Sequence, residues 1–256
     1  MHYISGDIEG MSGFGCAAGA PSHQELLTRH LAAAAEGMHE GGESFIRLRT
    51  WHGRPELPDY VEVVNGNRTE DFDLPGLTSE FAGLALVGFH GSAGSAFGHA
   101  YRFTHMMLNG SRIGEIAIQV LLAATRGVPT VFLAGNQAAI DEVLVWSPET
   151  VAVRTRPGLA GDEGPLDEKV LHAIRQGARR AVELKGAVAP PRIPEPLVFS
   201  APMPSESAAR MAETLPFDVR RDGKLVTIES ADFRSVYRFL LELFNACDKA
   251  RQNEES

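Results

Sequence analysis

The sequence predicts an α/β fold, with a mainly parallel sheet flanked by helices and a smaller C-terminal α/β lobe. Three observations favour it. The chain begins with a strand, a helix and a strand at the spacing of a βαβ unit, which implies parallel strands. The run GLALVGF at residues 83–89 is almost wholly apolar, as is typical of a strand covered on both faces. A proline-rich segment at residues 187–196 precedes a second set of short elements.

In chain order, each element follows from its apolar periodicity and its glycine or proline boundaries. Through the first part of the chain we expect a strand from Tyr3 to the pair Asp7 and Glu9, a helix at 21–38, strands at 44–50, 60–64 and 83–89, a hairpin at 103–113, a helix from 114 to about 127, a strand at 129–134 and a helix at 137–143. Asn109-Gly110 supplies the turn signal of the hairpin.

The second part of the chain predicts shorter elements. We expect a strand at 151–153, a loop at 158–165, a helix at 166–184, and then elements at 197–200, 205–215, 217–220, 225–228 and 235–247, with a polar, frayed tail at 249–256. From these patterns we predict a catalytic metal-binding α/β domain at residues 1–188, a Pro-rich linker at 189–196 and a smaller α/β lobe at 197–256.

Composition limits the classes of partner. The 256 residues are 44% hydrophobic and 22% charged, which is ordinary for a globular protein. The net charge of −9 argues against nucleic acid or an anionic membrane as the main partner. The two cysteines have no paired spacing, and no signal peptide or membrane-spanning run is evident. We therefore expect a cytoplasmic protein.

Metal-capable side chains follow several of the predicted strands. In open α/β sheets, ligands bind beyond the carboxyl ends of the strands. The candidates there are Asp7, Glu9, His52, His90 and, at a helix start, Glu115. Each has an ordinary structural interpretation, since a histidine after a strand is most often a turn residue and a glutamate in a first helical turn is favoured by the helix dipole. Together, their mixed carboxylate and imidazole chemistry suits zinc or manganese, and can hold two ions.

Other residues have weaker claims to a functional role. His23, His30 and His39 fall in or beside the first helix and are predicted to be surface histidines. No strand-to-helix elbow surrounds Ser92 or Ser95, and the chain has neither a phosphate loop nor a dinucleotide fingerprint.

The segments DIEGMSG at residues 7–13, GFH at 88–90 and IGE at 113–115 resemble signature segments of the zinc-dependent D-aminopeptidases. The likeness runs from residue 1 to about 145. It implies a site with two zinc ions per chain, in which Asp7, Glu9, His52, His90 and Glu115 are metal ligands, Asp7 is the bridging ligand and His99 is the catalytic residue. It also implies a large ring-like homo-oligomer that admits only short peptides.

Two departures from that family pattern bear on substrate choice. Arg49-Thr50-Trp51 replaces the usual Asp- or Asn-containing turn before His52, so that Trp51 can narrow the pocket or form an aromatic wall; the loop at 156–165 also differs. The resulting hypothesis is a dinuclear zinc aminopeptidase that removes an N-terminal residue, such as D-Ala, from short peptides by a metal-activated water. The alternatives are a non-catalytic metal- or peptide-binding homologue and a metal-dependent phosphatase. His52 and His90 are poor ligands for magnesium, the ion that such a phosphatase would need.

Overall fold

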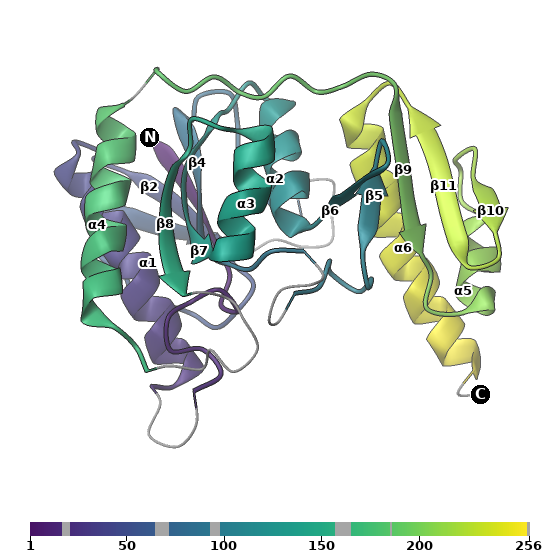
Figure 1. The fold of residues 1–256 in the computed structure, drawn as a ribbon, viewed down its shortest axis with the longest axis horizontal. Helices are drawn as coiled ribbons and strands as arrows, with labels where there is room; N and C mark the ends of the chain where they lie inside the picture. The colour runs from purple at the N-terminus through teal and green to yellow at the C-terminus, as the bar shows by residue number, and fades with distance from the viewer. Residues whose placement is uncertain (17–20, 65–71, 93–97, 157–164, 185, 255–256) are drawn as a thin grey trace.

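The fold contains two sheets, which Figure 1 shows side by side with helices around and between them. The structure is a computed structural model that describes residues 1–16, 21–64, 72–92, 98–156, 165–184 and 186–254. The first sheet has six parallel strands in the order β3-β2-β1-β4-β7-β8. Their bounds are β1 His2–Gly6, β2 Ile46–Thr50, β3 Val61–Val64, β4 Gly83–Phe89, β7 Thr130–Asn136 and β8 Val151–Arg156.

Helices cover both faces of this sheet. The helices α1 (His23–Glu40) and α4 (Glu168–Glu183) pack together on one face, over a core that includes Ile4 and Leu48. The helices α2 (Glu115–Ala124) and α3 (Gln137–Trp146) lie on the other, over a core that also extends into the second sheet. Strands covered in this way must be apolar along their whole length, which explains why every residue of β4 and β7 is buried.

The second sheet is antiparallel, with strand order β10-β11-β9-β5-β6. Its elements are β5 Met106–Leu108, β6 Ser111–Ile113, β9 Leu197–Pro202, α5 Glu206–Ala212, β10 Arg220–Asp222, β11 Leu225–Ser230 and α6 Phe233–Glu254. The β5–β6 hairpin turns at Asn109-Gly110, both with positive φ, and then pairs with β9. The division of the chain into 1–188, 189–196 and 197–256 stays a prediction, and this hairpin pairs across it.

The predicted fold class is confirmed, with two local corrections. The first strand ends at Gly6, before both carboxylates. The tail from residue 249 is not frayed as predicted, because α6 continues to Glu254. Most of the loop predicted at 158–165 lies outside the described residues. In the described part of the chain, no helix is long and apolar enough to cross a membrane.

His30 is also placed differently from its predicted surface position. It is fully buried in α1, where its Nδ1 lies 2.8 Å from the carbonyl oxygen of Leu26. It lies among the buried residues of α1, which include Leu26, Ala33 and Ala34, and burial lowers the pKa of His30 to about 4.

Candidate metal centre

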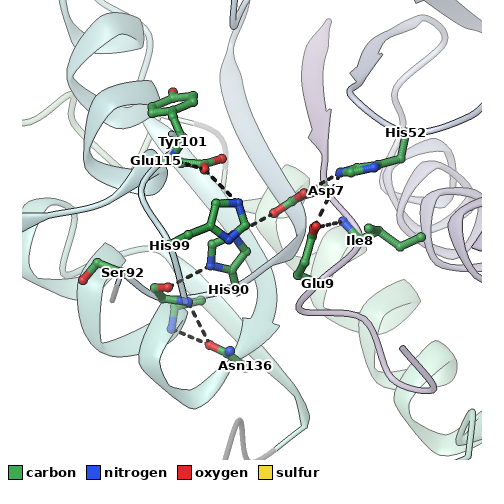
Figure 2. A network of polar contacts seen from close by, with 12 residues as sticks. Asp7, Ile8, Glu9, His52, His90, Ser92, His99, Tyr101, Glu115 and Asn136 are labelled. Atoms are coloured by element: carbon green, nitrogen blue, oxygen red, sulfur yellow. Dashed lines mark hydrogen bonds and ion pairs between the residues drawn. The ribbon is translucent and has the colours of Figure 1, made fainter. Parts of the chain in front are cut away.

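The candidate site lies at the carboxyl edge of the parallel sheet, where three adjacent strands end at the same level. Gly6, the last residue of β1, is paired with Thr50 at the end of β2 and with Val87 near the end of β4. The chain segments that leave these strands carry Asp7 and Glu9, then His52, then His90. Figure 2 shows the side chains converging from these segments and from the start of α2.

A tight turn after β1 presents the two carboxylates. The backbone N–H of Asp7 still donates to the carbonyl of Val87 at 2.9 Å, and that of Gly10 donates to Gly88 at 2.8 Å. Glycine is required at position 10, because a Cβ there would lie 1.8 Å from the carbonyl oxygen of Phe89. The sequence therefore predicted the proximity of the two carboxylates correctly, but a turn and not an extended strand produces it.

Asp7 occupies the middle of the cluster. Its Oδ1 lies 3.2 Å from Nε2 of His52, and its Oδ2 lies 3.6 Å from Nε2 of His90 on the opposite side (Figure 2). Glu9 reaches the same imidazole of His52, with Oε2 3.5 Å from its Nε2. The Asp7 side chain is only 5% exposed, and its Oδ2 is buried without a hydrogen-bond partner. An ionised oxygen in that position needs a cation or a donor to offset its lost hydration.

The orientation of His90 suits it to bind a cation. Its Nδ1 lies 2.8 Å from the carbonyl oxygen of Gly91, so that Nδ1 carries the proton and donates it. Nε2 faces Asp7, and when it carries no proton its lone pair is available to a cation, as in histidines that bind metals. Gly91 is held in turn, because its N–H donates to Oδ1 of Asn136 at 3.1 Å. Asn136 ends β7 and caps α3, where its Oδ1 also accepts from the N–H of Ala139.

Glu115 and His99 complete the cluster. Glu115 is the first residue of α2, and its Oε1 accepts the backbone N–H of Tyr101 at 2.8 Å and lies 3.5 Å from Nε2 of His99. The His99 ring stacks on that of His90 with centroids 4.4 Å apart. All six residues singled out in the sequence therefore lie in one cluster. The Tyr101 N–H and the Asn136 side chain were not anticipated, although an Asn directly before a helix is a recognisable N-cap signal.

The electrostatics of the cluster are those of crowded, buried carboxylates. Burial raises the pKa of Glu9 to about 7, and the negative charge of Asp7 adds to that effect. Burial also raises the pKa of Glu115 well above its usual value, again with a contribution from Asp7. Burial alone would raise the pKa of Asp7 as well, but its hydrogen bond to His52 and the charge of His90 lower it. The hydrogen bond to Asp7 correspondingly raises the pKa of His52.

The residues present fit a divalent metal. Among the described residues, two groups place their ligand atoms within 4.8 Å of one another: Asp7, Glu9 and His90, and His90, His99 and Glu115. A cation placed among them would relieve the repulsion between the carboxylates and satisfy the unpartnered Oδ2 of Asp7. Imidazole and carboxylate together form a zinc-type donor set.

Trp51 lies beside this cluster but is turned into a small packed group. The Arg49 guanidinium stands over its ring at 3.9 Å from the centroid, and Phe72 meets it edge-on at 4.3 Å. The indole Nε1 is buried without a hydrogen-bond partner. The segment Arg49-Thr50-Trp51, which departs from the family pattern, thus forms part of a packed aromatic and cationic group.

Comparison with known proteins identifies the family of this chain. The family model for D-aminopeptidase (peptidase M55) matches residues 1–242. A D-aminopeptidase of Bacillus subtilis (strain 168) is 21% identical over 193 residues, which cover 73% of this chain and 70% of the relative. The solved structure of DppA, a Zn-dependent, self-compartmentalizing D-aminopeptidase of Bacillus subtilis, has a TM-score of 0.83 and 18% identity, and the match covers 96% of this chain and 97% of that one. The chain belongs to the D-aminopeptidase family and is a peptide hydrolase.

Proposed function

We propose that this protein is a dinuclear zinc aminopeptidase that removes an N-terminal D-residue, such as D-alanine, from short peptides. The observation that carries the proposal is the position of Asp7, whose two carboxylate oxygens face His52 and His90 on opposite sides. A carboxylate with one oxygen toward each of two ligand groups is suited to bridge two ions.

The side chains divide into two sets around this bridge. Glu9 and His52 would hold one ion with Asp7, and His90 and Glu115 the other. When bound, zinc supplies an acidified water and a Lewis acid for the scissile carbonyl.

His99 is assigned to proton transfer or to stabilisation of the oxyanion. Its side chain is 43% exposed, whereas that of His90 is 2% exposed. It lies outside the regular strands, between residues 93–97, which are not described, and Tyr101. A ligand benefits from a rigid, buried platform, while a group that exchanges protons with substrate must remain accessible. The stacking on His90 places the His99 imidazole beside the ligand set, so metal content must be measured for variants of both.

The relative DppA is described as self-compartmentalizing. By analogy we propose that this chain also assembles into a ring-like homo-oligomer that restricts access to short peptides. Sedimentation should give a mass well above that of a dimer; a monomer at micromolar concentration would remove this explanation of substrate size.

A paired panel of dipeptides tests the proposed activity. Purified protein, analysed for bound zinc, is assayed with D-Ala-D-Ala, D-Ala-L-Ala, L-Ala-D-Ala and L-Ala-L-Ala, before and after chelation and zinc restoration. We expect rapid hydrolysis only where the N-terminal residue is D, with loss on chelation and recovery with zinc. Zinc binding without hydrolysis of any member would favour the non-catalytic homologue, and equal rates on the L series would refute D-selectivity.

A further inference from the structure

The helix α2, which carries Glu115, begins without a cap of its own. Its N-cap residue is Gly114, which has no side chain to accept the free amide hydrogens of the first turn. Such amides otherwise leave the helix end poorly fixed unless a partner is supplied from elsewhere. Because Glu115 is the first helical residue, the position of its carboxylate depends on how firmly this turn is held.

Glu142 of α3 supplies the missing cap through space. Its Oε1 accepts the backbone N–H of Gly114 at 2.8 Å and that of Ala117 at 3.2 Å. Its Oε2 accepts the N–H of Ser92 at 3.0 Å, two residues beyond His90. A single carboxylate therefore connects the segment that carries His90 to the helix start that carries Glu115. Charge-assisted bonds of this kind to a helix N-terminus are stronger than neutral ones.

The close packing around this carboxylate also explains the glycine before Glu115. A Cβ at position 114 would lie 2.9 Å from both Oε2 of Glu142 and Cβ of Ser92. Any larger residue would push apart the two segments that the carboxylate connects. Glycine at this position thus permits the contact, and the contact replaces the cap that glycine cannot provide.

We propose that Glu142 is a positioning residue that sets the separation of His90 and Glu115. In this role it touches neither substrate nor metal, and acts through its hydrogen bonds to the segments of Ser92 and Gly114. The proposal rests on the proposed function, because it assumes that His90 and Glu115 bind the same metal centre.

Glu142→Ala, Glu142→Gln and the control Asp141→Asn test this. Asp141 is an exposed carboxylate on the same helix that accepts from Gln137 at 2.9 Å, so its variant removes equal charge without touching the three amides. Glu142 borders an open surface cavity of about 300 Å³, through which water can reach the vacated amides, and Glu142→Ala is therefore expected to fold. Three quantities are measured well below the unfolding temperature: zinc affinity by competition with a chelator, amide hydrogen exchange in the metal-free protein, and the d–d absorption of the cobalt-substituted protein.

Loss of an outer partner of metal ligands typically weakens metal binding by ~10–100-fold. We expect that range for Glu142→Ala, a smaller loss for Glu142→Gln, which keeps one acceptor oxygen, and less than a twofold change for Asp141→Asn. The amides of Ser92, Gly114 and Ala117 should exchange faster in Glu142→Ala, while those of β7 should not. The d–d absorption of the cobalt-substituted protein should also shift in Glu142→Ala, which a loss of global stability alone would not cause.

Zinc affinity within twofold of the parent in Glu142→Ala would overturn the proposal, whether or not the amides exchange faster. If that variant does not fold, Glu142→Gln decides by the same criterion, with at least a threefold loss of affinity required. A parent protein that binds no zinc would instead refute the proposed function. Even then, hydrogen exchange in the metal-free proteins would test the contact by itself. If the amides of Ser92, Gly114 and Ala117 exchange no faster in Glu142→Ala than in the parent, Glu142 does not hold these segments.

Discussion

Tyr237→Phe removes one oxygen atom from a buried network that joins the second sheet to the metal centre. Tyr237 lies on α6, and its hydroxyl donates to Oδ2 of Asp73 at 2.6 Å while accepting the backbone N–H of Asp73 at 2.9 Å. The hydroxyl of Tyr101 donates to the same Oδ2 at 3.0 Å, and the N–H of Tyr101 donates to Glu115. Asp73 and Tyr237 are each 1% exposed.

The size of the effect follows from these two bonds. The bond to a carboxylate is worth about 1.5–3 kcal/mol, and a buried N–H left without a partner costs about 1–3 kcal/mol. The two are not independent, because Tyr101 still donates to the carboxylate and can shift toward it. We therefore expect Tyr237→Phe to lower the free energy of unfolding by about 2–4 kcal/mol. For a chain of this length, each 1 kcal/mol lowers Tm by about 2–4 °C.

Urea unfolding and calorimetry of the metal-free protein measure this loss. Tyr60→Phe is the matched control, because it removes the same atom from a partly exposed ring that stacks on His39 at 4.2 Å. The control should change stability by less than about 0.5 kcal/mol. If Tyr237→Phe loses no more than the control, the Asp73 network does not hold α6 in place and the reasoning fails.

Three further predictions concern the site and its surroundings. His99→Ala should keep its zinc and hydrolyse substrate at least ~10²-fold more slowly than the parent. His90→Ala should lose both its zinc and its activity. Zinc depletion in His99→Ala would reassign His99 as a ligand. The parent should carry close to two zinc ions per chain by mass-spectrometric metal analysis, and Glu9→Gln should carry about one; a parent with one ion and an unaffected variant would contradict the dinuclear centre. Burial raises the pKa of Asp73 to about 6, so the folded state holds a proton that the unfolded chain has released, and the stability of the metal-free parent should fall as pH rises from about 4 to about 6. One pKa unit corresponds to about 1.4 kcal/mol, so Asp73→Asn should remove up to about 3 kcal/mol of this loss of stability. If the stability of Asp73→Asn depends on pH in the same way as that of the parent, the raised pKa is not that of Asp73.

The parallel sheet and its ligand-bearing edge could be predicted because they depend on local patterns. An apolar run such as Gly83–Phe89 has few uses other than as a covered strand, and a polar residue directly after such a run must emerge at the sheet edge. That logic was enough to bring Asp7, His52 and His90 together, although it says nothing of the backbone between them. The turn at Asp7 arises from hydrogen bonds to β4, which lies some eighty residues away in the sequence.

These patterns could not predict contacts between segments that lie far apart in the sequence. The local sequence of the β5–β6 hairpin predicts an independent unit. In the structure, however, β5 pairs with β9, which follows the proline-rich segment. His30 was predicted to lie on the surface because nothing in the sequence of α1 alone indicates that tertiary packing will bury it. Such pairings depend on which faces meet in three dimensions, a property that periodicity within one element does not encode.

The two kinds of residue at the site have different structural origins, and this makes their effects separable. The ligand-type side chains lie where strands end or a helix begins, so the sheet itself fixes their approximate positions. Asn136 and Glu142 belong to β7 and α3, and hold backbone amides beside those side chains. A change in a ligand therefore alters the donor set, whereas a change in either supporting residue leaves the donors present and displaces them. The first should abolish binding of an ion, and the second should weaken it while preserving its stoichiometry.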